Sequence, residues 1–192
     1  MRTRALAALL LLTLALTACV AVTPPTDEPP VDEPSAVEER EPLRLDALNV
    51  ELVAQERDTD ALLALQKAFP AALQAALAAQ DVTVDAVNVT FGTSGAATAT
   101  ALRDGAVELA FLPAESWTEA EQGVLVALER GNADDPARSV MVLAADEPRL
   151  TDALRAALPA LAPVLSDYAD GGYVWDEAEA AALTAAGDTN DA

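Results

Sequence analysis

Short runs of apolar residues, several of them alternating with polar ones, predict a series of β-strands along most of the chain. LNVELVA (48–54) and VTVDAVNVT (82–90) alternate apolar and polar positions, which is typical of strands with one face in a core. VELAFL (107–112) is apolar at nearly every position and predicts a strand buried on both faces. Two further runs complete the expected strands, at 124–128 and 139–144.

Between and after these strands, apolar residues recur at helical spacing. The first such pattern runs from Leu62 to Leu77, and either Asp58 or Thr59 can cap its start. Pro70 lies inside this pattern and is predicted to kink or divide the helix. Further helices are expected at 94–104, closed by Gly105, from 149 onward with interruptions at Pro159 and Pro163, and at 175–186.

The alternation of strands and helices indicates the class of fold. Strand, helix and strand follow one another at a spacing that fits βαβ units, so the sequence predicts an α/β fold for residues 44–192. We expect a single-lobe three-layer sandwich with a mostly parallel sheet of about five strands. Right-handed crossovers are expected to place the first two helices on one face of the sheet and the later helices on the other.

The first residues have the pattern of a secretory signal peptide (1–18), with two arginines, a short apolar run and then small residues. The run ends in Leu-Thr-Ala-Cys, which resembles the lipobox of bacterial lipoproteins. This resemblance implies that Cys19 is acylated and anchors the protein to the extracytoplasmic side of a membrane. The alternative is a free cysteine behind an ordinary signal, although Cys19 is the only cysteine and has no disulfide partner. The rest of 19–43 is rich in proline and acidic residues and predicts a disordered tether.

Composition and charge argue against several classes of function. The formal net charge is −21, so nucleic acids are not expected partners. Histidine is absent, so neither a zinc site nor histidine-based catalysis is expected, no cofactor is predicted, and an enzyme is disfavoured. Paired acids at 134–135 and 146–147 leave carboxylate chemistry or calcium binding as an alternative, but both pairs lie in predicted turns. Tyr173 and Trp175 either line a pocket or pack the last helix on the sheet.

Three segments are expected to meet at the carboxyl edge of the sheet, where ligands of parallel α/β folds gather. The candidate residues that follow the first three strands are Gln55, then Thr93, Ser94 and Gly95, and then Ser116 and Trp117. The middle segment offers hydroxyls, backbone amides and the positive end of a helix dipole, which suit a phosphate, phosphonate, sulfate or carboxylate. The alternative is ordinary helix capping, with the glycine serving backbone geometry.

The order of these elements resembles a known family over about 45–131. Ala-Leu-Arg-Asp-Gly (101–105) leads into Val-Glu-Leu-Ala-Phe-Leu-Pro (107–113), and Ser116-Trp117 follows. This arrangement is similar to the N-terminal lobe of phosphate/phosphonate-type substrate-binding lipoproteins of ABC transporters. The resemblance implies one half of a periplasmic-binding-protein fold, with a small oxyanion at 93–95 and with Ser116 and Trp117 shaping the pocket.

The chain departs from that family in its length. Members have two lobes, whereas the fourth and fifth expected strands here follow one another too closely to admit a second lobe. One hypothesis is a solute-binding-like protein related to phosphate/phosphonate uptake, with an ABC permease or a separate second-lobe protein as candidate partners. The other hypothesis is a degenerate envelope lipoprotein that binds no ligand and acts as a protein-interaction module.

Overall fold

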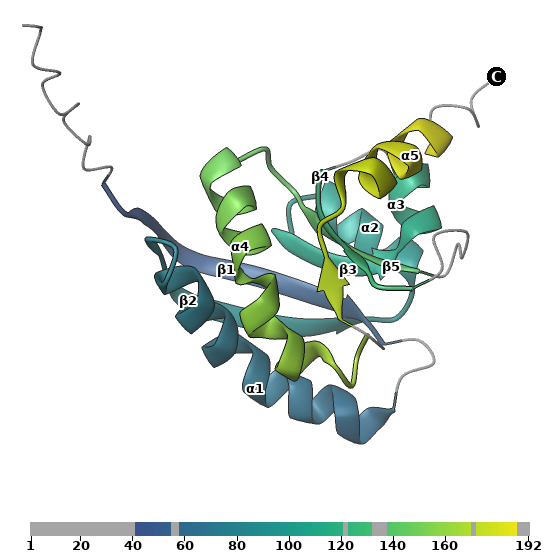
Figure 1. Cartoon of the computed structure of the whole chain (residues 1–192). Helices are drawn as coiled ribbons and strands as arrows, with labels where there is room; N and C mark the ends of the chain where they lie inside the picture. Colours follow the sequence, from purple (N-terminus) through teal and green to yellow (C-terminus); the bar gives the residue numbers. More distant parts are fainter. Residues whose placement is uncertain (1–40, 55–57, 121–122, 132–137, 170–171, 188–192) are drawn as a thin grey trace, which may run out of the picture. The chain divides into compact units, whose positions relative to one another are not determined.

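The computed structural model describes residues 41–54, 58–120, 123–131, 138–169 and 172–187 (Figure 1). All of them belong to one compact unit, Arg40–Ala192. The predicted signal peptide, Cys19 with its predicted acylation and nearly all of the predicted tether lie outside the described residues, and so does Gln55.

The described residues build a six-stranded sheet in the order β2-β1-β3-β5-β4-β6. Its strands are β1 (Leu43–Val53), β2 (Val82–Gly92), β3 (Leu109–Pro113), β4 (Val124–Glu129), β5 (Ser139–Leu143) and β6 (Tyr173–Val174). β1 pairs in parallel with β2 and β3, β5 is antiparallel to β3 and β4, and β6 is antiparallel to β4. The first four strands therefore run in one direction. The predicted α/β fold is confirmed, and the short β6 adds an edge strand to the five that were expected.

Helices cover both faces of this sheet, which makes three layers (Figure 1). The helices are α1 (Thr59–Ala78), α2 (Gly95–Arg103), α3 (Ala114–Ala120), α4 (Pro148–Leu165) and α5 (Glu177–Gly187). α1 and α4 share one hydrophobic core with the sheet, whereas α2, α3 and α5 contribute to a second core.

The prediction that the first two helices share a face is wrong. β1 lies between β2 and β3, so the connection through α1 steps outward from β1 to β2, and the connection through α2 then steps back across β1 to β3. Two right-handed crossovers that step in opposite directions place their helices on opposite faces of the sheet. This reversal leaves α2 on the side of α3, with which it forms the site described below.

Proline does not divide the long helices. Asp58 caps α1 by accepting hydrogen bonds from two backbone amides of the first turn, and α1 continues through Pro70 for 20 residues. Phe69 and Leu73, on either side of this proline, are both fully buried, and their packing holds the helix together across the break in its hydrogen bonding. α4 likewise continues through both of its internal prolines. By length and composition α1 can cross a membrane, but its buried residues pack on the sheet as in a core helix.

An aromatic cluster fills the core between the sheet and the α1–α4 layer. Phe111 of β3 makes edge-to-face contacts with Phe69, Tyr168 and Tyr173, at centroid distances of 5.8, 6.2 and 5.2 Å. The Tyr168 hydroxyl donates to the carbonyl of Val53, at the carboxyl end of β1, over 3.1 Å. The chain after α4 is therefore packed against the sheet, which favours the packing interpretation of Tyr173 over the pocket interpretation.

Candidate functional site

The start of α2 lies at the carboxyl edge of the sheet, directly after β2. Ser94 is the N-cap: its backbone is extended, and its hydroxyl accepts a hydrogen bond from the amide of Ala97 over 3.2 Å. The amides of Gly95 and Ala96 also belong to the first turn, where an α-helix provides no carbonyl partner. Thr93 is exposed beside them. This end of α2 therefore combines ordinary capping by Ser94 with the polar groups that an anion requires.

Gly95 brings the start of α2 against α3. It is buried, and a Cβ added at this position would overlap the Ser116 hydroxyl and lie 2.9 Å from Cδ of Pro113. Only a glycine allows such a close approach. The segments after β2 and β3, which the sequence analysis expected to converge, are thus in contact through Gly95 and Ser116.

Trp117 lies elsewhere. Only 8% of its surface is exposed, and it belongs to the core between the sheet and the α2–α3–α5 layer, together with Leu112 and Val140. Its side chain therefore packs in the interior, between α3 and the sheet. Of the residues proposed from the sequence, the structure brings Ser94, Gly95 and Ser116 together, with the exposed Thr93 next to them.

A carboxylate that the sequence analysis did not single out lies next to this cluster. Glu51 of β1 accepts hydrogen bonds from the hydroxyls of Thr98, over 2.7 Å, and Thr90, over 3.3 Å. A Cβ at Gly92 would overlap the Thr98 hydroxyl and come within 2.7 Å of the Glu51 carboxylate. Thr98 is fully buried and lies one helical turn after Ser94. A negative charge is thus built in beside the start of α2, where it opposes a second anion.

The signal for Glu51 in the sequence was weak. It occupies a polar position of an alternating strand, and its direct neighbour across the β1–β2 pair is Thr90. Such positions are normally read as solvent-facing, and the second partner of Glu51, Thr98, comes from a helix 47 residues further along the chain.

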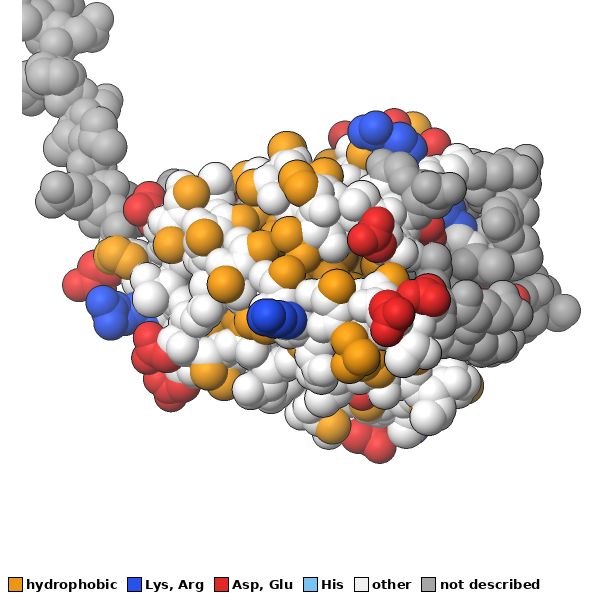
Figure 2. All heavy atoms as spheres, turned by 90° about the horizontal axis from the view of Figure 1, so that it is seen from below, with side chains coloured by type: hydrophobic (Ala, Val, Ile, Leu, Met, Phe, Trp, Pro, Cys, Tyr) orange, Lys and Arg blue, Asp and Glu red, His pale blue; other side chains and the backbone are white. Residues whose placement is uncertain are grey.

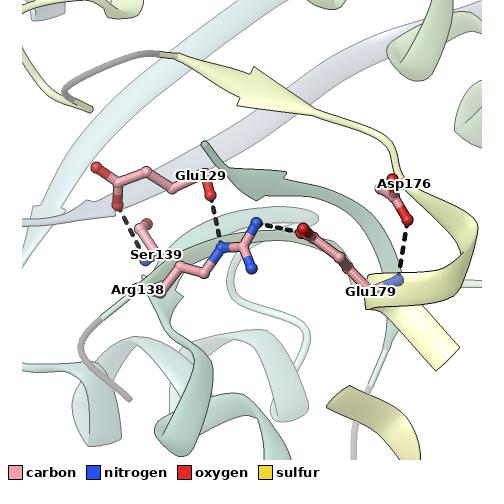
Figure 3. Close-up of polar contacts among 5 residues, drawn as sticks. All are labelled: Glu129, Arg138, Ser139, Asp176 and Glu179. Atoms are coloured by element: carbon pink, nitrogen blue, oxygen red, sulfur yellow. Dashed lines mark hydrogen bonds and ion pairs between the residues drawn. The ribbon is translucent and has the colours of Figure 1, made fainter. Parts of the chain in front are cut away.

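A buried arginine occupies the other half of the same edge, near the start of β5 (Figure 3). The guanidinium of Arg138 donates to the carbonyl of Glu129 and to the carboxylate of Glu179 on α5, in each case over 2.6 Å. The Glu129 carboxylate accepts from the amide of Ser139 over 3.0 Å, and Asp176 accepts from the amide of Glu179 over 3.0 Å. The Arg138 side chain is 6% exposed and its charge is balanced by Glu179, so this ion pair fastens α5 to the sheet.

The Arg138 backbone also reaches the predicted site. Its carbonyl accepts from the amide of Ala114, the first residue of α3, over 2.8 Å. The first residue of α3 is therefore hydrogen-bonded to Arg138, and Ser116 of α3 packs against Gly95. α3 thus links the Arg138 ion pair to the start of α2 along the carboxyl edge.

The alternative of calcium binding finds no support among the described residues. They contain no group of three or more acidic or cysteine side chains arranged to hold a metal ion. Glu147 caps α4 by accepting from the amide of Arg149 over 3.2 Å, which accounts for one member of the 146–147 pair. The pair at 134–135 lies outside the described residues.

Comparison with known proteins identifies the fold and no family. No protein-family model matches the chain, and no curated protein sequence matches it. Two solved structures of XAC2383 from Xanthomonas citri are similar to it. The structure bound to chloride ion has a TM-score of 0.51 at 11% identity and covers 74% of this chain and 98% of that chain. The structure bound to ATP has a TM-score of 0.50 at 11% identity, with coverages of 75% and 98%.

At 11% identity this likeness concerns the fold alone. The match covers 98% of the XAC2383 chain, so a single α/β lobe of this kind makes up nearly all of that chain. A second lobe is therefore not required for such a lobe to fold.

Proposed function

We propose that the chain is a lipid-anchored, extracytoplasmic solute-binding-like protein whose single α/β lobe holds a small oxyanion at the start of α2. The observation that carries this proposal is the contact between Gly95 and Ser116, which places a second hydroxyl beside the Ser94 cap and the first-turn amides. Hydroxyls and amides at the positive end of a helix dipole suit a phosphate or phosphonate group. The resemblance to phosphate/phosphonate uptake proteins supports the same class of ligand, and the role is binding rather than catalysis.

Two further points bear on the ligand. XAC2383, which has the same fold, has been obtained bound to chloride ion and to ATP, and both of these ligands are anions. In this chain the net charge of −21 and the nearby Glu51 both oppose an anion, so we expect weak binding, in the millimolar range.

Isothermal titration calorimetry tests the proposal. A soluble form that begins at Val20 keeps every described residue and is titrated with phosphate, phosphite and methylphosphonate. Ser116→Ala is expected to weaken binding severalfold, because one hydroxyl donor is lost. Ser166→Ala is the matched control, since the exposed hydroxyl of Ser166 donates only to the carbonyl of Pro163 at the end of α4.

Glu51→Gln should change the affinity for an oxyanion in the opposite direction from Ser116→Ala. Removal of one negative charge about one helical turn from the site is expected to tighten oxyanion binding about tenfold. The absence of heat with all three ligands at millimolar concentration, in the wild type and in Glu51→Gln alike, would exclude oxyanion binding.

A second candidate function, a protein-interaction module without a solute, is favoured by a different observation. The strong charges at the carboxyl edge already have internal partners: Arg138 pairs with Glu179, and Glu51 accepts from two threonines. An ABC permease or a separate second-lobe protein is the partner to seek. Copurification of either one with the membrane-anchored protein, without heat in the titrations above, would favour this function.

A further inference from the structure

The outer surface of α1 and α4 differs from the rest of this acidic protein. Between Ala61 and Gln80 the single charged residue is Lys67, and between Ala153 and Ser166 it is Arg155. The exposed side chains that form this surface are otherwise small or apolar: Leu63, Ala64, Ala68, Ala71 and Ala75 on α1, and Ala156, Pro159, Ala160 and Pro163 on α4. We call these nine residues, with Lys67, the α1–α4 face.

Acidic residues surround this face and do not interrupt it. Figure 2 views the domain from the side on which α1 lies in Figure 1, and it shows hydrophobic and uncharged side chains around a basic one near the middle, with acidic side chains at the left edge and, right of centre, next to the grey residues. Exposed acids lie near the ends of the helices, with Asp60 in the first turn of α1, Asp152 in the second turn of α4 and Asp167 beyond the end of α4. Leu63, one of the two large hydrophobic residues that are exposed among the described residues, is 58% exposed on this face.

We propose that the α1–α4 face is the interface of a symmetric homodimer. A chain with a net charge of −21 repels its own copies over most of its surface, and this face is where two copies can meet without opposing carboxylates. Lys67 lies within the face while the acids lie around it, so a second copy with a modest offset brings each lysine toward the partner's acidic margin. The alanines allow the helices of two copies to approach closely.

Sedimentation equilibrium of the soluble form from Val20 tests the dimer. The wild type is expected to sediment with twice the monomer mass at tens of micromolar protein. The double variant Ala68→Glu, Ala71→Glu is expected to be a monomer, because it places two carboxylates of each copy in the interface. The double variant Ala181→Glu, Ala182→Glu is the matched control: these alanines are also exposed on a helix, α5, on the other side of the sheet, and the dimer should persist.

Circular dichroism of both variants separates lost association from lost folding, because the substituted alanines are exposed and the helix content should be unchanged. The proposal is overturned if the wild type is a monomer at several hundred micromolar, or if the α1–α4 variant still dimerises. It is also overturned if the wild type is a monomer that binds phospholipid vesicles or a membrane partner through this face.

Discussion

Replacing Gly95 with alanine tests the contact that joins α2 to α3. In a helix alanine is more favourable than glycine by about 1 kcal/mol, so an unobstructed position would gain stability. Here the added Cβ overlaps the Ser116 hydroxyl and lies 2.9 Å from Pro113 Cδ and 3.0 Å from Ser116 Cβ. Overpacking of this kind costs about 1–3 kcal/mol. We therefore expect Gly95→Ala to lower the free energy of unfolding by about 1 kcal/mol.

A double-mutant cycle assigns this loss to the named contact. Ser116→Ala removes the hydroxyl that the new methyl group meets, so the double variant should recover about 1 kcal/mol relative to the sum of the single changes. Urea unfolding of the soluble form, followed by circular dichroism, measures all four free energies. Gly131→Ala is the control, because a Cβ at Gly131 meets no atom within 4 Å.

Two results would refute this reasoning. One is a Gly95→Ala variant as stable as the wild type or more stable, which would mean that the start of α2 is open at this point. The other is a coupling energy of zero between positions 95 and 116, which would mean that the two segments do not touch in solution.

Three further predictions concern contacts at the site and the cap of α1. Glu179→Ala leaves the buried Arg138 guanidinium without its carboxylate and should lower the free energy of unfolding by about 2 kcal/mol. This is less than the loss for a fully buried ion pair, because Glu179 is 38% exposed. Glu179→Gln keeps an oxygen acceptor and should lower the free energy of unfolding by less. Thr98→Val removes the 2.7 Å hydrogen bond to Glu51 and should lower the free energy of unfolding, measured in urea, by about 1.5–3 kcal/mol. A change near zero would contradict the contact. Asp58→Ala removes the cap of α1 and should cost about 1 kcal/mol, whereas Asp58→Asn should cost little, and equal losses in the two would contradict capping.

The sequence predicted the fold class because β1 and β2 alternate over much of their length and β3, β4 and β5 are apolar and buried at nearly every position. The start of β1 shows where the alternation signal fails. Its inward positions are Leu43 and Leu45, and then Leu48, Val50 and Leu52, so the alternation changes phase near Asp46 and Ala47. A continuous alternation of apolar and polar positions is found only from Leu48 onward, and this is why the strand was expected to begin at Leu48. The two-residue β6 and the seven-residue α3 are too short to show any period.

The candidate site was predictable where strand order alone decides it. The carboxyl ends of β2 and β3 lie at one edge of the sheet, so Ser94, Gly95 and Ser116 come together. The charged members were not predictable, because Glu51 meets Thr98, and Arg138 meets Glu179 41 residues later, only through tertiary packing. No local pattern distinguishes these residues from the many solvated charges of this chain.

The most direct test of oxyanion binding follows the backbone amides at the start of α2 by ¹H–¹⁵N NMR while phosphate is added to the soluble form. We expect saturable chemical-shift changes that are largest at Gly95 and Ala96 and extend to Ser116. In Glu51→Gln these changes should reach saturation at lower phosphate concentrations than in the wild type. Unchanged amides at these positions in 20 mM phosphate, or saturable shifts confined to another part of the domain, would contradict the proposed site.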